Sequence, residues 1–217
     1  MKPAPPSHRT QVFIFLLAIL LVAGGISSVQ SQQTSERPTF RQNRAKDVAP
    51  AESRPGRKEK PQISAKQAEE MFRKVLVGDP QNANVLNYLG YMLADRGMRL
   101  DEALNMIKKA VDLDPANGAY LDSLGWAYYK LGKYDLAEDT LMKASQRIGT
   151  DPTVQDHLGD LYQKTGRLKL AAAHWERALL EWNKTVAAEV DQNDVARVQK
   201  KLESAKMKLA REDSQNK

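Results

Sequence analysis

The sequence contains no cysteine, and this absence excludes several kinds of protein. Without cysteine there is no disulfide framework, no zinc or iron–sulfur centre held by thiolates, and no thiol nucleophile. A bacterial lipoprotein is excluded as well, because its lipid is attached to a cysteine. The three histidines, His8, His157 and His174, are too few and too scattered for an ordinary histidine metal site. We therefore expect neither a metal site nor a cofactor.

Catalytic motifs are missing too. The sequence has no Gly-x-Gly-x-x-Gly, no phosphate-binding Gly-Lys-Ser/Thr loop and no His-Glu-x-x-His. Asp156 and His157 are neighbours, so on a helix their side chains point about 100° apart and form no catalytic pair. His157 is interpreted as an ordinary helix-face residue and His174 as a partly exposed one. We predict that the protein is not an enzyme and has no catalytic residues.

The net charge of +6 is concentrated near the N-terminus. Residues 32–62 hold eight basic and four acidic side chains, whereas residues 63–180 hold 15 basic and 16 acidic ones. A nucleic-acid partner requires a basic surface on the folded part of the chain. Because that part is neutral, we expect no nucleic-acid partner.

Residues 1–31 have the order of a secretory signal peptide. Lys2 and Arg9 precede the apolar run 12–26, and a small and polar stretch follows, with a cleavage site after Ser31. As a helix the run spans about 22 Å, short of a roughly 30 Å hydrocarbon core. A retained membrane anchor is the alternative. Either interpretation predicts export of the rest of the chain, to the periplasm or beyond, because the positive flank stays inside.

Residues 32–62 are rich in Pro, Arg, Gln, Ser and Glu, and Phe40 is their only aromatic residue. Such a segment cannot bury enough apolar surface to offset its ordering entropy, so we predict a disordered linker. Its basic stretch Arg54–Lys60 has an alternative role in contacting anionic lipid or polymer. The segment 37–60 is also a candidate ligand for the chain's own folded part.

An internal repeat organises the rest of the chain. Segments starting at Val85, Tyr120 and Val154 align, and their apolar residues recur at three- and four-residue steps, which predicts helices. The recurring small residues are Gly90, Gly125 and Gly159; Gly97, Gly132 and Gly166; Ala103, Ala137 and Ala171; and Ala110, Ala144 and Ala178. A glycine inside a helix costs roughly 0.5–1 kcal/mol against alanine. The recurrence of the first set therefore indicates that a neighbouring helix approaches too closely for a side chain.

These residues resemble the tetratricopeptide repeat, a helix–turn–helix unit of 34 residues. The matching positions are Leu86, Leu89, Gly90, Gly97, Ala103, Ala110 and Pro115; Leu121, Leu124, Gly125, Tyr128, Gly132, Ala137 and Ala144; and Leu158, Gly159, Tyr162, Gly166, Ala171, Trp175 and Ala178. The resemblance implies an all-α fold, a right-handed superhelix of antiparallel helix pairs. We expect repeats over 63–182: a half repeat at 63–80 and full repeats at about 83–115, 118–151 and 152–182.

A last amphipathic helix is predicted over 190–212, with Val195, Val198, Leu202, Ala205 and Leu209 on one stripe. Stacked repeats need a cap with a polar outer face, and this helix fits that role. Binding to a partner is the alternative. Trp175 and Trp182 are predicted to pack against the cap. At the front end, the half repeat lacks a first helix, so its edge is exposed, self-associating or covered by the preceding segment.

The resemblance also indicates where a partner binds, because the first helix of each repeat lines the inner groove in this family. Carried over to this sequence, the groove candidates are Asn87, Tyr91, Asp95, Asp122, Trp126, Tyr129, Asp156 and Asp160. They predict an aromatic, net acidic groove that favours a partner with basic groups. Family members that clamp a C-terminal carboxylate carry lysine where this chain has Asn87, Asp122 and Asp156, so that mode is not expected. For Trp126 and Tyr129, packing against the next helix pair is the alternative.

The sequence thus predicts a non-enzymatic interaction module of the cell envelope that holds a peptide or protein segment in its groove. A membrane-anchored assembly subunit, with the N-terminal segment retained, is the alternative. Membrane contact is expected only through that N-terminal segment.

Overall fold

The computed structural model describes residues 64–185 and 190–215, so the predicted signal peptide or anchor at 1–31 and the predicted linker at 32–62 lie outside the described residues. In the described part every regular element is an α-helix, which confirms the all-α prediction. The helices are α2 (Ala65–Gly78), α3 (Ala83–Asp95), α4 (Leu100–Leu113), α5 (Gly118–Lys130), α6 (Tyr134–Ile148), α7 (Pro152–Lys164), α8 (Leu168–Lys184) and α9 (Gln192–Gln215).

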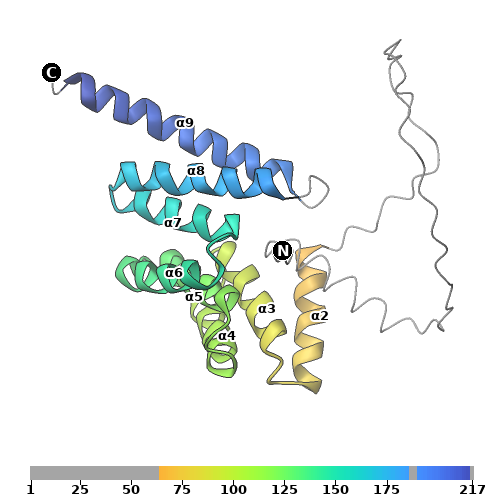
Figure 1. The fold of residues 1–217 in the computed structure, drawn as a ribbon. Coiled ribbons are helices and arrows are strands. Elements are labelled where there is room, and N and C mark those ends of the chain that lie inside the picture. The colour runs from red at the N-terminus through yellow and green to blue at the C-terminus, as the bar shows by residue number, and fades with distance from the viewer. Residues whose placement is uncertain (1–63, 186–189, 216–217) are drawn as a thin grey trace, which may run out of the picture.

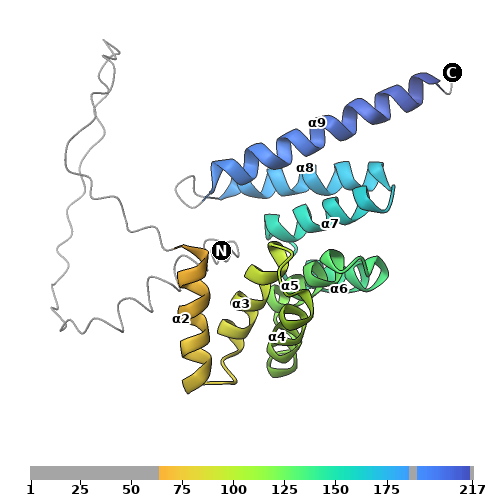
Figure 2. The ribbon, with the colours of Figure 1, turned by 180° about the vertical axis from the view of Figure 1, so that it is seen from behind.

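The helices form antiparallel pairs that stack side by side (Figure 1). The closest packing is within the pairs α3–α4, α5–α6 and α7–α8, and each pair then packs on the next. At one end α2 lies against α3, and at the other end α9 runs along α8 (Figures 1 and 2). The fold is therefore an α-solenoid with a single helix added at each end.

Short polar side chains start the first helix of each pair. The side chains of Asn82, Asn117 and Asp151 each accept a hydrogen bond from a backbone N–H near the start of the helix that follows. Such caps satisfy donors that a helix leaves unpaired at its start. At α2, Ser64 and Gln67 form a capping box, with both reciprocal hydrogen bonds present.

Glycines with positive φ make the turn inside each pair. Gly97, Gly132 and Gly166 have φ of 66°, 73° and 79°, a left-handed conformation that favours glycine. After each glycine, the next backbone N–H bonds back to a carbonyl five residues earlier, as in Met98 to Leu93 at 2.9 Å. This is the Schellman arrangement that ends a helix, and its three occurrences give the three pairs the same bend.

The glycines inside the first helices mark close contacts, as predicted. A Cβ added at Gly125 would lie 2.6 Å from Cγ and 2.8 Å from Cδ2 of Leu141 on the paired helix. At Gly90 it would meet Cγ1 of Ile107 at 2.6 Å, and at Gly159 it would collide with the indole of Trp175. The packing of each pair therefore leaves no room for a side chain at these positions.

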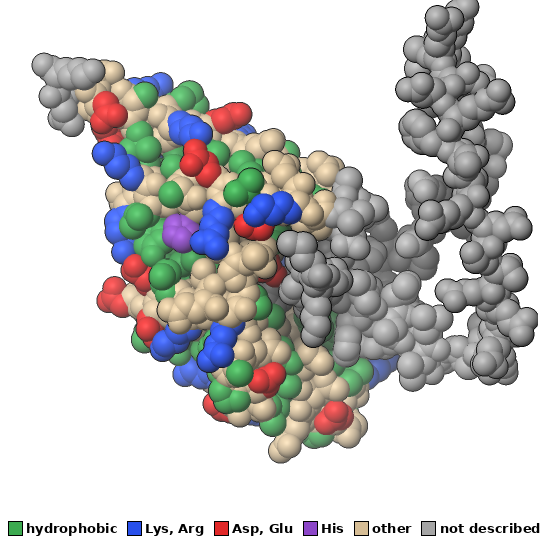
Figure 3. Space-filling view, in the orientation of Figure 1, with side chains coloured by type: hydrophobic (Ala, Val, Ile, Leu, Met, Phe, Trp, Pro, Cys, Tyr) green, Lys and Arg blue, Asp and Glu red, His purple; other side chains and the backbone are tan. Residues whose placement is uncertain are grey.

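The helix α9 completes the core at the C-terminal end. Its residues Val198, Leu202 and Ala205 belong to the same buried cluster as Trp175 and Trp182 of α8. Both tryptophans thus pack with the last helix, as the sequence predicts. Figure 3 shows Lys, Arg, Asp and Glu side chains interspersed over the described residues of one face, in keeping with the balanced charge of this part of the chain.

Candidate functional site

A cavity of about 370 Å³ lies along the first helices of the three pairs. α3 contributes Tyr91 and Asp95, α5 contributes Trp126, Tyr129 and Lys130, and α7 contributes Thr153, Asp156, His157 and Asp160. α8 adds Trp182, and α9 adds Asp194, Arg197 and Lys201. The stacking of the pairs brings the corresponding faces of α3, α5 and α7 together, and α9 closes one side.

Six of the groove candidates line this cavity: Tyr91, Asp95, Trp126, Tyr129, Asp156 and Asp160. Asn87 and Asp122 are not among its lining residues, since they are only 1% and 0% exposed. Asp122 turns instead into the interface between α5 and α7. Sequence reasoning found the correct helix faces but did not separate the buried members from the accessible ones.

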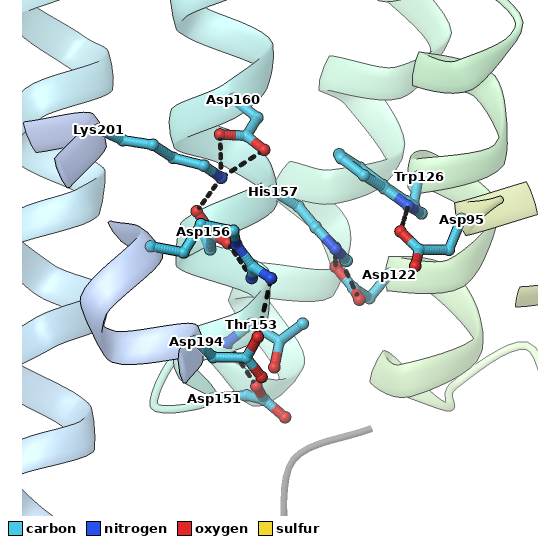
Figure 4. Close-up of polar contacts among 11 residues, drawn as sticks. Asp95, Asp122, Trp126, Asp151, Thr153, Asp156, His157, Asp160, Asp194 and Lys201 are labelled. Carbon is cyan, nitrogen blue, oxygen red and sulfur yellow. Dashed lines mark hydrogen bonds and ion pairs between the residues drawn. The ribbon is translucent and has the colours of Figure 1, made fainter. Parts of the chain in front are cut away.

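His157 is buried, so its interpretation as an ordinary helix-face residue is wrong. Its Nδ1 lies 3.0 Å and 3.1 Å from the two carboxylate oxygens of Asp122 (Figure 4). Burial alone lowers the pKa of His157, but the charge and hydrogen bond of Asp122, with Asp156 and Asp160 nearby, raise that pKa above its ordinary value overall. The pair ties the second repeat to the third beneath the cavity. The two residues are 35 positions apart, one more than the 34-residue repeat, so they do not occupy equivalent positions of the two repeats and the repeat pattern did not single them out.

Trp126 takes part in both packing and the cavity wall. Its ring stacks on Tyr129 with centroids 4.7 Å apart and on His157 with centroids 4.1 Å apart. The indole N–H donates to Asp95 Oδ1 at 3.2 Å, which links α5 to α3. Because the residue is only 7% exposed, it offers the cavity little of its ring. The packing interpretation of Trp126 is therefore favoured by this geometry.

The acidic residues of α7 are paired with cations of α9. The ammonium of Lys201 lies 2.8 Å from Asp156 and 2.6 Å from Asp160 (Figure 4). Arg197 lies 3.1 Å from Asp156. Arg197 also binds Asp194 at 2.8 Å. The acidic charge of the predicted groove is therefore largely compensated at this end, because α9 docks with its basic side chains inside the groove.

Burial also shifts the pKa of two residues in the groove, Asp160 and Tyr129. It raises the pKa of Asp160, an effect that neighbouring Asp156 increases and Lys201 opposes. Burial, together with Asp160, Tyr134 and Asp156, raises the pKa of Tyr129 to about 12. The Tyr129 hydroxyl therefore stays protonated at neutral pH and can serve as a hydrogen-bond donor.

The cavity has the size of a small ligand site. Its volume falls in the lower part of the roughly 300–1,000 Å³ range of ligand sites, and both aromatic and charged side chains line it. In residues 64–185 and 190–215, no group of three or more His, Asp or Glu side chains could hold a metal ion. Over the same ranges, the structure shows no helix with the length and apolar character needed to span a membrane.

The stacked pairs, the glycine turns and the close-packed helix glycines define a helical-repeat protein. Residues 96–152 match the family model described as Tetratricopeptide repeat. Over 94 residues the chain is 47% identical to the TPR repeat-containing protein PA4667 of Pseudomonas aeruginosa, an alignment that covers 43% of this chain but only 16% of the relative. The segment 96–152 is therefore a match to the tetratricopeptide repeat, and the chain is similar to proteins built from this repeat.

Solved structures support the same fold. A chain of the APC/C hetero-tetramer Cut9–Hcn1 superposes with a TM-score of 0.60 at 24% identity, covering 67% of this chain and 27% of that one. The TPR protein TTC0263 of Thermus thermophilus gives a TM-score of 0.50 at 25% identity, covering 63% and 72%. Proteins of this fold are generally non-enzymatic scaffolds for protein–protein interaction, so the fold supports protein partners in general.

Proposed function

We propose that this protein is a non-enzymatic scaffold of the bacterial cell envelope that holds a peptide or protein segment in the cavity between α3, α5, α7 and α9. The single observation that carries the proposal is the cavity itself, lined from these helices by aromatic and charged side chains. Aromatic side chains anchor interfaces well, and paired charges around them set specificity.

The Asp95 side of the cavity fits a partner segment best. There Asp95 and Tyr129 combine an acceptor, a ring surface and a phenol donor, whereas Lys201 and Arg197 bind the acids at the α9 side. A segment with a basic or amide side chain next to an apolar one would match this combination, because donors and apolar surface are then both accommodated.

The envelope location is part of the proposal and rests on residues 1–31. Their basic start, apolar run and small polar end have the order of an export signal. The alternative is a membrane-anchored assembly subunit in which this segment is retained. N-terminal sequencing of the protein from fractionated cells separates the two: a start near Gln32 supports cleavage, and an intact Met1 in membranes supports the anchor.

Site-specific photocrosslinking in cells tests the binding site. A benzophenone amino acid replaces Tyr129 in the cavity or, as the control, Leu180, which is 54% exposed and is not among the residues lining the cavity. We expect a discrete crosslinked protein from position 129 only. A crosslink of equal yield from position 180, or adducts from that position alone, would contradict the cavity as the binding site.

A further inference from the structure

The α9 end of the cavity shows how this site binds basic side chains. Lys201 lies between the carboxylates of Asp156 and Asp160, with distances of 2.6 to 2.8 Å. Arg197 is held in the same way by Asp156 and Asp194. Lys201 and Arg197 therefore each contact two carboxylates, and both of these cations belong to this chain. At the opposite end the lining carboxylate is Asp95, where α3 finishes.

The described chain begins close to that opposite end. An ion pair joins Glu69 to Arg99, and a second joins Arg73 to Glu102 at 2.7 Å. These contacts hold the middle of α2 against the turn that follows Asp95 and against the first turn of α4. Since α2 and α3 run antiparallel, α2 starts at the end where α3 finishes (Figures 1 and 2). The chain thus enters the fold beside the Asp95 end of the cavity.

The sequence that precedes this entry point is strongly basic. Arg54–Lys60 (RPGRKEK) carries four basic residues and one acidic residue, and it ends four residues before Ser64. At about 3.4 Å per extended residue, its members lie within about 14 to 34 Å of Ser64. Ser64 is only about 7.5 Å along the helix from Glu69, and packed helices are about 8–10 Å apart. The connection is therefore long enough to reach Asp95.

We propose that Arg54–Lys60 binds in the Asp95 end of the cavity of its own chain and competes there with the partner segment. The lining residues hold four carboxylates, Asp95, Asp156, Asp160 and Asp194, against three cations, and the buried Asp122 lies behind them. A segment with an excess of three positive charges complements this balance. Tethering gives it an effective concentration of about millimolar, so that weak complementarity suffices.

A partner must displace this segment, so the proposal rests on the proposed function and goes beyond a scaffold that is always open. The affinity for the partner would be lower when the segment Arg54–Lys60 is present and higher when the charges of this segment are removed. It would also favour partners that add apolar contacts with Tyr129, which the segment RPGRKEK, without any aromatic or large aliphatic side chain, does not make.

The absence of cysteine provides a clean test in the full chain. Arg57→Cys is combined with Lys130→Cys in the cavity wall or, as the control, with Asp101→Cys. Asp101 is exposed, lies in the first turn of α4 next to Glu102, which pairs with Arg73 of α2, and is not among the residues that line the cavity. With a short bis-maleimide, we expect the cavity pair to crosslink within one molecule at about threefold or higher yield than the control pair.

Two further arms decide the outcome. Replacing Arg54, Lys58 and Lys60 by glutamine, or adding 0.5 M salt, should lower the crosslinking yield of the cavity pair to that of the control pair, because the attraction is electrostatic. If Lys130→Cys disturbs the fold, Tyr129→Cys replaces it as the cavity position. Equal yields for the two pairs would overturn the proposal. So would crosslinks only between molecules, which would assign the segment to a second copy, or a cavity yield that anionic vesicles abolish, which would assign it to a lipid surface.

Discussion

Replacing Gly125 by alanine tests how closely the helices of a pair approach. The new Cβ would lie 2.6 Å from Cγ of Leu141 and 3.1 Å from its backbone nitrogen. Leu141 is fully buried, so neither its branch point nor its backbone can move without disturbing α6. Overpacking of this kind costs about 1–3 kcal/mol, whereas the gain in helix propensity is only about 0.5–1 kcal/mol. We expect a net loss of about 0.5–2 kcal/mol in the free energy of unfolding.

The matched control is Gly78→Ala at the end of α2, where an added Cβ meets nothing within 4 Å. Without a clash, only the propensity term remains, so this variant should be neutral or more stable by up to about 1 kcal/mol. Urea unfolding followed by circular dichroism at 222 nm measures both variants. A Gly125→Ala protein as stable as the Gly78→Ala protein would refute the close-approach argument for all three helix glycines.

The remaining predictions concern the groove. Trp126→Ala should lower the free energy of unfolding by about 3–5 kcal/mol, as for a core aromatic. A small change in melting temperature would contradict the packing interpretation and favour contact with a ligand. Lys201→Met should lose about 2 kcal/mol or more because it leaves two mostly buried carboxylates without their shared cation, while Lys200→Met, at an exposed neighbour, should change little. The raised pKa of His157 means that its pair with Asp122 stabilises the fold fully below about pH 6.5 and less as the pH rises through the raised value. Thermal melts from pH 6 to 9 should show this decline in the native chain, and a decline of the same size in Asp122→Asn would contradict the assignment.

Local rules explain why so much of the fold was predictable. Gly97, Gly132 and Gly166 stand where the backbone needs positive φ, and Ser64 and Asp151 stand where a helix needs a cap. These requirements involve only a few neighbouring residues, so each leaves a visible mark in the sequence. The repetition strengthened the prediction of the helix pairs, because the same residue types recur about one repeat length apart.

The cavity was harder to predict because its chemistry depends on contacts between distant helices. Asp122 and His157 are 35 residues apart, and whether they meet depends on how far α7 is rotated against α5. Lys201 reaches Asp160 only because α9 docks along α8 with its basic side chains turned inward. A helical pattern shows which residues share a face, but not which neighbour that face will meet or which charges will be cancelled there.

The two ends of the stack are held with unequal strength. α2 buries only Ala68 and Phe72, whereas α9 buries Asp194, Val198, Leu202 and Ala205 and adds the ion pairs of Arg197 and Lys201. In an array whose units contact only their neighbours, fraying starts at the weaker end. A pulling force applied through the N-terminal segment would therefore peel α2 from α3 first and leave the α7–α9 end intact. The molecule would yield to mechanical load in a fixed order, one helix pair at a time, from the side where its chain enters the fold.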